Sequence, residues 1–359
     1  MMVSRVNKLN SIEVVRAFAA LLVILFHIQT AFGVQIAVEP FRSIVGGGHR
    51  GVDLFFVLSG FIIAFVHRDD LGRPGRLNNY LYNRFVRIFP AVWIVSALAL
   101  MFYLYGPAIP DKAGKLAPYP ILASVLLLPQ QGVPLVNVTW TLTYEIFFYV
   151  LFAAMIVNIR LGLAVLLAWQ GITALIALSG ADLGLAGYYF RAICLDFSVG
   201  LAAAWLVHRA ATNAVPLAAW TGILALGVAG FIVGMWFDSS AVYAAALCAF
   251  GSGLIIVALV KIEQRKDLHI PQWLVAIGGA SYAIYLVHFS VIQVLSMIVR
   301  RLGLPPSELL YFVYVPAGIV AGMVFDSWVD KPIQRRLRQL KPTLLRSHPA
   351  AAASGFGPR

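Results

Sequence analysis

The sequence has few charged residues, and this shortage excludes an ordinary soluble protein. Only 12% of its 359 residues are charged and 61% are hydrophobic, whereas a soluble domain carries about 25% charged residues. Hydrophobic runs of about 17–25 residues recur along almost the whole chain, and each is long enough to cross a hydrocarbon core of about 30 Å. The composition therefore predicts a single membrane domain.

The sequence also has only two cysteines and no pattern typical of metal ligands. The two cysteines, Cys194 and Cys248, lie in apolar runs and indicate neither a disulfide framework nor a metal site. No His, Asp and Glu cluster has ligand spacing, and no serine has the pattern of a nucleophile elbow. We therefore expect no metal and no tightly bound cofactor.

The net charge of +12 could suggest a nucleic-acid-binding protein, but its distribution follows the positive-inside rule of membrane proteins. If ten helices span the membrane and the N-terminus is cytoplasmic, 20 of the 27 lysines and arginines face the cytoplasm. The apolar stretch 119–129 is too short to span. A crossing there would also invert every later loop, so we interpret it as a re-entrant or interfacial segment.

The predicted fold class is therefore all-α, a polytopic membrane protein with both ends in the cytoplasm. Residues 1–341 form one transmembrane domain, and residues 342–359 form a disordered cytoplasmic tail. The basic N-terminus resembles that of a signal peptide, but Arg16 and His27 interrupt the apolar run, so we interpret it as the first helix. The ten spans are expected at about 12–33, 51–67, 88–106, 142–158, 161–179, 188–208, 216–236, 242–260, 273–299 and 309–328.

Ionisable side chains inside membrane helices are costly, so each is a candidate functional residue. Arg16 and His27 are eleven residues apart, which is close to three helical turns, so they share a helix face about 16 Å apart along the axis. A single histidine in a helix can also simply bind a neighbouring helix. The shared face with Arg16 favours a functional role.

Two further clusters combine charge with aromatic residues. Arg84 and Arg87 share a helix face at the predicted cytoplasmic mouth, where they would suit a phosphate-bearing ligand or simply anchor the protein. Glu145, near the start of an apolar helix, needs a cationic or proton-donating partner. Trp140 and Tyr144 could form one wall of a site or belong to an aromatic belt at the membrane surface.

Further along the chain, Ser281, Tyr285 and His288 share a face of one predicted helix, where they could line a site or join helices. Asp53 lies near a helix end, where an aspartate is often only a cap. Neutral imidazole is the usual general base near pH 7, and a carboxylate can orient it. We therefore expect His27 to pair with Glu145 in a partly dry cavity.

The polar clusters together resemble the motifs of the acyltransferase-3 family of membrane O-acyltransferases. The resemblance covers about residues 11–340, and five blocks occur in the family's order. They are Arg16 and His27 with ten residues between them, the run from Gly51 to Phe61, Arg84-x-x-Arg87-x-x-Pro90, Trp140-Thr141-Leu142 with Glu145, and Ser281-Tyr282-x-x-Tyr285-x-x-His288. Asp330-Lys331-Pro332 is similar to the family's Glu-Lys-Pro, with Asp in place of Glu.

This resemblance implies transfer of an acyl group, most often acetyl, from cytoplasmic acyl-CoA to a hydroxyl of a cell-surface or exported carbohydrate. It implies a multi-pass protein of the bacterial inner membrane. His27 would be the catalytic base, supported by Arg16, and Glu145 a second essential residue. Arg84 and Arg87 would bind the CoA phosphates. We expect Asp53, Trp140, Tyr285 and His288 to contribute to substrate binding.

Two other classes of membrane protein remain as alternatives. A transporter could use the buried His, Arg and Glu residues as a relay, but the sequence shows no internal repeat. A polytopic glycosyltransferase usually has acidic residues in a large outer loop. The longest predicted outer loop, 107–141, has Asp111 as its only acid.

Overall fold

The computed structural model describes residues 9–32, 41–106, 112–209, 215–237, 242–305 and 307–341. These ranges are almost entirely helical and contain no strand. Ten helical stretches within them are long and apolar enough to cross a membrane. The predicted all-α fold with ten spans is therefore confirmed, whereas the predicted tail at 342–359 lies outside the described residues.

The long helices account for the ten spans, and short helices connect some of them. The long ones are α1 (Asn10–Phe32), α3 (Gly51–His67), α4 (Leu77–Tyr105), α7 (Trp140–Val157), α8 (Ile159–Ser179), α9 (Asp196–Arg209), α10 (Leu217–Trp236), α11 (Val242–Glu263), α13 (Ser281–Arg301) and α14 (Tyr311–Phe325). The short ones are α2 (Phe41–Gly46), α5 (Lys112–Lys115), α6 (Pro118–Leu126), α12 (Gln272–Gly279) and α15 (Lys331–Gln339).

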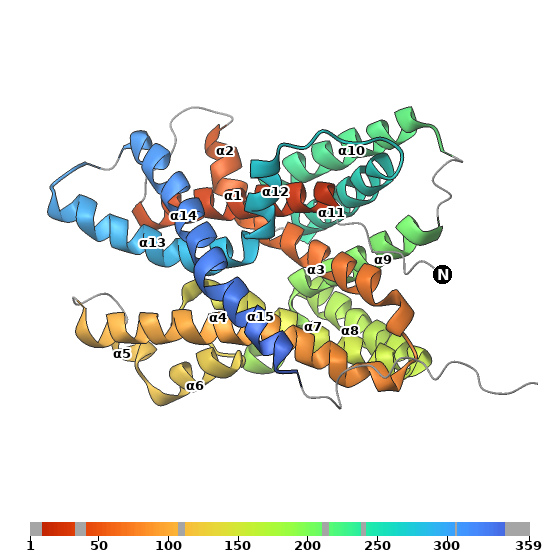
Figure 1. The fold of residues 1–359 in the computed structure, drawn as a ribbon, viewed down its shortest axis with the longest axis horizontal. Coiled ribbons are helices and arrows are strands. Elements are labelled where there is room, and N and C mark those ends of the chain that lie inside the picture. The colour runs from red at the N-terminus through yellow and green to blue at the C-terminus, as the bar shows by residue number, and fades with distance from the viewer. Residues whose placement is uncertain are drawn as a thin grey trace, which may run out of the picture.

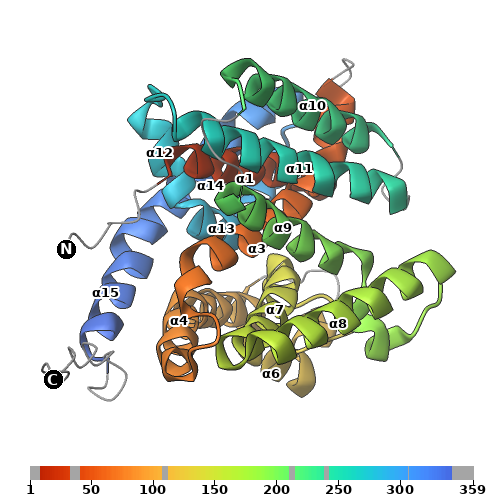
Figure 2. The same cartoon turned by 90° about the vertical axis from the view of Figure 1, so that its right-hand side faces the viewer.

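The helices form two groups that meet along α3 (Figures 1 and 2). One group contains α4, α7 and α8, and the other contains α1 with α10 to α14. Helix α3 packs against α1, α7 and α9, so it contacts both groups. Its inward face is fully buried, because residues such as Phe56, Val57 and Phe61 fill the space between the groups. The junction between the groups is where the candidate site lies.

Helix α4 begins eleven residues earlier than predicted, at Leu77 instead of residue 88. The predicted span covered only the apolar part of the helix, but a helix satisfies its own backbone hydrogen bonds even where its side chains are charged. Pro90 lacks only one donor and lies inside the helix. The eleven additional residues add about 16 Å of helix before the predicted start, and this part of the helix carries Arg84 and Arg87.

The predicted span at 273–299 is divided in the structure. Helix α12 ends at Gly279, Ala280 leaves helical geometry, and α13 begins at Ser281. Helix α12 crosses α1 so closely that a Cβ on Gly278 would meet the Glu13 carbonyl oxygen at 1.9 Å. The bend lets α12 pack on α1 while α13 continues across the bundle, a tertiary contact that hydropathy does not encode.

The segment 119–129 does not span, as predicted. Helix α6 has nine residues, or about 14 Å, and it is followed by Leu127, which has a left-handed backbone conformation (φ 55°). Trp93 Nε1 of α4 donates to the Val125 carbonyl at 2.9 Å. The segment is therefore a short helix packed against α4.

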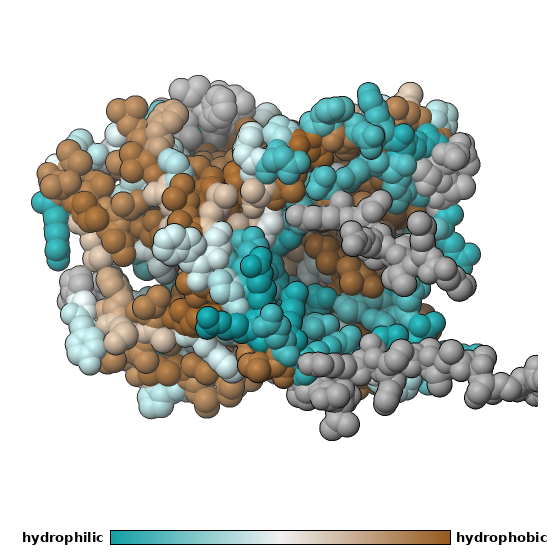
Figure 3. Space-filling model, viewed as in Figure 1, coloured by the Kyte–Doolittle hydropathy of each residue, from teal (hydrophilic) through white to brown (hydrophobic). Residues whose placement is uncertain are grey.

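The two ends of the molecule differ in polarity. Hydrophilic residues gather at the right-hand end and along α15 in Figure 3, whereas hydrophobic residues cover most of the left-hand part. Helix α15 carries Arg335, Arg336 and Arg338 and packs beside α4, where the Tyr82 hydroxyl donates to the Leu337 carbonyl at 2.6 Å. The hydrophilic right-hand end includes the N-terminal end of α1 and the first turns of α4 (Figure 1).

Candidate active site

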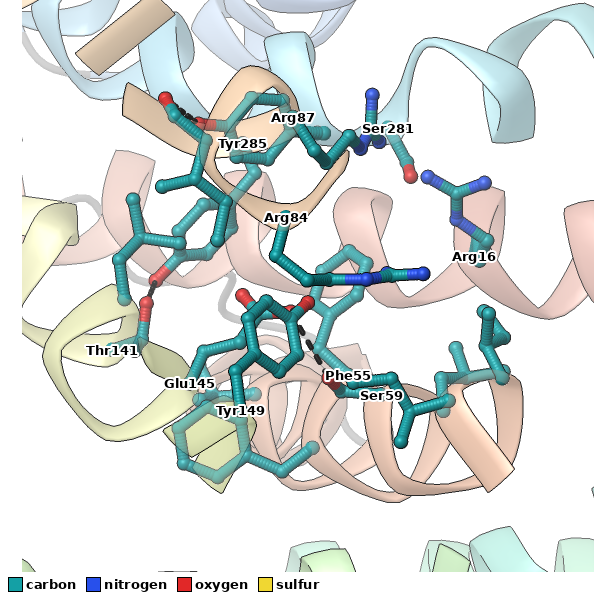
Figure 4. A pocket seen from close by; sticks show the side chains of 18 residues that line it. Arg16, Phe55, Ser59, Arg84, Arg87, Thr141, Glu145, Tyr149, Ser281 and Tyr285 are labelled. Atoms are coloured by element: carbon teal, nitrogen blue, oxygen red, sulfur yellow. Dashed lines mark hydrogen bonds between the residues drawn. The ribbon is translucent and has the colours of Figure 1, made fainter. Parts of the chain in front are cut away.

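A cavity of about 180 Å³ lies where the two helix groups meet, between α1, α3 and α13 on one side and α4 and α7 on the other. Along α3 its lining extends from Val52 to Ile63, about 16 Å of helix. Its polar lining residues are Arg16, Ser59, Arg84, Arg87, Thr141, Glu145, Tyr149, Ser281, Tyr282 and Tyr285. Figure 4 shows Arg84 extending across this cavity, with Arg87 and Ser281 on one side of it and Ser59 and Tyr149 on the other.

Arg84 is held in place by aromatic rings and a histidine. Its Nη2 donates to His67 Nε2 at 2.8 Å, and His67 Nδ1 donates to the Asp70 carboxylate at 2.9 Å. The guanidinium lies 5.7 Å from the ring centre of Tyr80 and 5.5 Å from that of Tyr149. A guanidinium fixed in this way loses little side-chain entropy when it binds an anion.

The other two arginines are held by carboxylates that lie outside the cavity lining. Arg16 donates to Glu13 at 2.9 Å, one turn earlier on α1. Arg87 lies 3.7 Å from Asp330 and 4.7 Å from the ring centre of Tyr282. The cavity lining thus contains three guanidiniums and one carboxylate, Glu145, which favours an anionic ligand.

Glu145 accepts hydrogen bonds from two hydroxyls and does not pair with His27. Ser59 Oγ of α3 donates to its carboxylate at 3.0 Å, and the Tyr149 hydroxyl, one turn along α7, also donates to it. Both hydroxyls donate to the same oxygen, Oε1, so hydroxyls and not an imidazole are the proton-donating partners of Glu145. The expected pair of His27 and Glu145 is therefore wrong for this structure.

His27 pairs instead with His288 of α13. His27 Nδ1 lies 3.0 Å from both His288 Nε2 and the Val23 carbonyl oxygen. His288 Nδ1 lies 2.7 Å from the Tyr285 carbonyl oxygen and 3.1 Å from that of Ile284. The two histidines therefore form a dyad, which no spacing within one helix could indicate.

The carbonyl oxygens determine where the protons of this dyad lie. A carbonyl only accepts, so His288 Nδ1 carries a hydrogen and donates it. In a neutral His288 the Nε2 atom is then an acceptor, and His27 Nδ1 donates to it. A neutral His27 consequently has its lone pair on Nε2, the nitrogen that can accept a proton.

Tyr285 lies between the dyad and the cavity. Its ring lines the cavity, its ring centre is 5.8 Å from that of His288, and its hydroxyl is 2.8 Å from Thr141 Oγ1. At the far end of the cavity, next to Val52, Gly51 packs against the α1 turn from Ala19 to Val23, because an added Cβ would lie 2.7 Å from the Ala19 carbonyl oxygen and 2.9 Å from the Val23 side chain. His27 is one helical turn beyond Val23, so the cavity ends at least about 6 Å short of His27 along α1.

The remaining predicted substrate residues lie outside the cavity lining. Asp53 is only 2% exposed and belongs to a separate buried cluster with Arg50, 3.3 Å away, and Asp196. Trp140 packs edge-on against Tyr144, with ring centres 5.9 Å apart. Of the four residues, Tyr285 lines the cavity and His288 lies directly behind it.

Sequence reasoning missed Ser59, Tyr149 and His67 as parts of this site. Tyr149 is four residues after Glu145, so helical spacing could have identified it. Ser59 lies within the run from Gly51 to Phe61, but its role becomes visible only when α3 meets α7. Among the described residues, no group of three or more His, Cys, Asp or Glu side chains could hold a metal ion.

Comparisons with known proteins agree with this architecture. The chain is similar to the exopolysaccharide production protein ExoZ of Rhizobium meliloti, with 26% identity over 318 residues that cover 82% of this chain and 92% of that protein. It is also similar to the acyltransferase MdmB of Streptomyces mycarofaciens, at 26% identity over 96% of this chain and 97% of that one. The peptidoglycan O-acetyltransferase OatA of Listeria monocytogenes is 24% identical over 79% of this chain but only 49% of its own length.

No solved structure matches this chain. A family model described as an acyltransferase domain matches residues 9–326, which include every helix that contributes to the cavity and the histidine dyad. The chain therefore belongs to the acyltransferase-3 family of membrane acyltransferases.

Proposed function

We propose that this protein transfers an acyl group, most often acetyl, from cytoplasmic acyl-CoA to a hydroxyl of a cell-surface or exported carbohydrate. The protein would act in the bacterial inner membrane, with the basic ends of α1 and α4 facing the cytoplasm. The carbohydrate acceptor is supported by the names of two relatives, an exopolysaccharide production protein and a peptidoglycan O-acetyltransferase. The observation that carries the proposal is a cavity lined by three arginines, with a histidine dyad behind Tyr285 outside its lining.

The arginines support the donor half of the reaction. A CoA ester carries several phosphate charges at one end and its thioester at the other. Guanidiniums of Arg84, Arg87 and Arg16 would bind the phosphates, because planar forks match phosphate oxygens. The pantetheine arm would then extend along the cavity toward Val52, near His27.

His27 would act in the transfer step, as the base for the acceptor hydroxyl. As the acceptor oxygen attacks the thioester carbon, its proton would move to His27 Nε2. The C–S bond then breaks, and the CoA sulfur leaves with a proton returned from the imidazolium. His288 would keep His27 in the required tautomer, and Glu145 would hold Ser59 and Tyr149 beside Arg84.

The test uses purified protein in liposomes with radiolabelled acetyl-CoA and unacetylated surface polysaccharide from a strain that lacks the gene. We expect label to enter the polysaccharide with parental protein and not with His27→Ala. Polysaccharide acetylation should likewise be lost in the deletion strain. Carbohydrate transport across the liposome membrane without label transfer would instead establish the transporter alternative.

A further inference from the structure

A second hollow lies at the opposite end of α1 from Arg16. It has a volume of about 500 Å³ and is lined by Phe26, Gly46, Gly47, His49, Met235, Trp236 and Phe237. We call it the aromatic pocket. None of the described residues that line it is charged, in contrast to the three arginines of the first cavity. Its ligand is therefore expected to be neutral.

The pocket is built by close packing of a short 3₁₀ turn, η1 (Gly47–Arg50), between α1 and α10. A Cβ on Gly47 would lie 2.6 Å from the Met235 carbonyl oxygen, and one on Gly48 would lie 2.4 Å from that of Leu22. Only glycine permits these approaches. The turn therefore fixes His49 against Phe26, with ring centres 5.3 Å apart.

His49 provides a polar group that lacks a protein partner. Its Nδ1 donates to the Gly46 carbonyl at 3.1 Å, so a neutral ring has its lone pair on Nε2. That Nε2 is buried and has no hydrogen-bond partner. A buried acceptor without a partner is costly, and a ligand hydroxyl would satisfy it.

The aromatic rings provide apolar faces beside this acceptor. Trp236 is 60% exposed and Phe237 is 44% exposed, and both line the pocket. The C–H groups on one face of a sugar ring carry partial positive charge and suit the negative face of an aromatic ring. Aromatic faces next to a hydroxyl acceptor, without nearby charge in the lining, match the chemistry of a neutral saccharide.

The pocket also lies next to the proposed base. The Phe26 ring contacts His49 on one side and His27 on the other, with centres 5.3 and 5.5 Å apart. The Phe26 ring therefore separates the pocket from His27, and a saccharide in the pocket would lie one ring away from the proposed base, on the side opposite the arginines. We infer that the aromatic pocket binds the saccharide acceptor, an inference that rests on the proposed acyl transfer.

Steady-state kinetics of acyl transfer would test the pocket. The acceptor would be fragments of the unacetylated surface polysaccharide. Trp236→Ala, Phe237→Ala and His49→Leu should each raise the acceptor KM about 2- to 12-fold, as expected for one aromatic contact or one hydrogen bond. Their KM for acetyl-CoA should not change. Trp205→Ala is the matched control, because Trp205 is 58% exposed on α9, away from the pocket lining. Unchanged acceptor KM in all three variants would overturn the inference.

A binding assay separates this inference from the proposed function. Gly46 has helical backbone angles and no atom within 4 Å of an added Cβ, so Gly46→Cys places a thiol in the pocket without strain. Cys194 and Cys248 are both 0% exposed and should not react. The polysaccharide fragments should slow labelling by a membrane-impermeant maleimide, whereas acetyl-CoA should not.

Protection of this thiol without any acyl transfer would support the pocket and contradict the proposed function. Acyl transfer without protection would support the function and overturn the pocket. Labelling that lipid or detergent slows, and that the fragments leave unchanged, would identify the pocket as a lipid site and also overturn the inference.

Discussion

At the scale of single residues, His27 is separated from the arginines that would bind the donor. Arg16 and His27 are about 16 Å apart along α1, and His27 does not contribute to the described lining of the cavity. His27→Ala should therefore reduce acyl transfer about 10²–10⁴-fold, the usual effect of losing a general base. Binding of acetyl-CoA, measured by calorimetry, should be unchanged. Transfer at the parental rate would mean that His27 only packs helices.

His288 should act through the tautomer of His27. His288→Leu removes one of the two acceptors for His27 Nδ1 and leaves the Val23 carbonyl oxygen, and loss of one hydrogen bond should lower kcat roughly 2- to 12-fold. His288→Gln offers a carbonyl acceptor, so it should retain more activity than the leucine variant. A purely structural role would give equal losses in both variants, with matching decreases in thermal stability.

Arg84 and Arg87 should determine the affinity for the donor. Each charge-assisted contact contributes about 1.5–3 kcal/mol, so Arg84→Ala or Arg87→Ala should weaken acetyl-CoA binding roughly 10- to 150-fold. Arg160→Ala is a suitable control, because Arg160 is exposed in the first turn of α8. If the double variant binds acetyl-CoA normally, both arginines only anchor the protein at the membrane surface.

The site shows what sequence can and cannot predict at this scale. Motifs identified Arg16, Arg84, Arg87, Glu145 and Tyr285, and all five line one cavity. Their partners could not be predicted, because they depend on which helices meet. His27 and His288 are 261 residues apart, and Glu145 contacts a serine of α3, so spacing along one helix contained no information about either contact.

At the scale of elements, hydropathy predicted the number of spans but not the breaks and extensions. Hydropathy identifies only the part of a helix that can enter lipid. It therefore placed the start of α4 at residue 88, after the polar residues of its first turns. It could not detect the bend at Ala280, because both α12 and α13 are apolar. The π-helical turn η8 (Asp326–Asp330) between α14 and α15 lies at the end of the span predicted at 309–328, and hydropathy did not indicate it either.

The crossing of α12 over α1 gives a prediction for a pair of adjacent glycines. A Cβ at position 278 would lie 1.9 Å from the Glu13 carbonyl oxygen, whereas Gly279 has no atom within 4 Å of an added Cβ. Gly278→Ala should therefore destabilise the protein by about 1–3 kcal/mol and displace Glu13, the partner of Arg16. Gly279→Ala should be nearly neutral.

Thermal unfolding in detergent and acetyl-CoA affinity would measure both glycine variants. Gly278→Ala should lower both quantities relative to Gly279→Ala. Equal unfolding temperatures for the two variants would show that α1 and α12 are not in the close contact described.

At the scale of the whole molecule, the two cavities lie at opposite ends of α1 and imply an orientation. Under the proposed function, the cavity with three arginines would need access to cytoplasmic acyl-CoA, and the aromatic pocket would need access to an exported carbohydrate. Charge independently favours the same orientation, since 20 of the 27 basic residues belong to the end with the N-terminus if ten helices span. The three site arginines are among these 20, but without them 17 of the remaining 24 basic residues still belong to the same end, so the charge distribution predicts a cytoplasmic N-terminus without the site.

Reporter fusions test this orientation. A reporter that is active only in the cytoplasm should work when fused after Gly75 or Arg265, and it should fail after Lys112 or Gly303. The structure sharpens the expectation, because α6 has nine residues and cannot reach across a hydrocarbon core of about 30 Å. Activity after Lys112 would reverse the orientation and put the arginines on the side without acyl-CoA. Failure after Arg265 would mean that the segment around α6 crosses the membrane after all, and the ten-span arrangement would then be wrong.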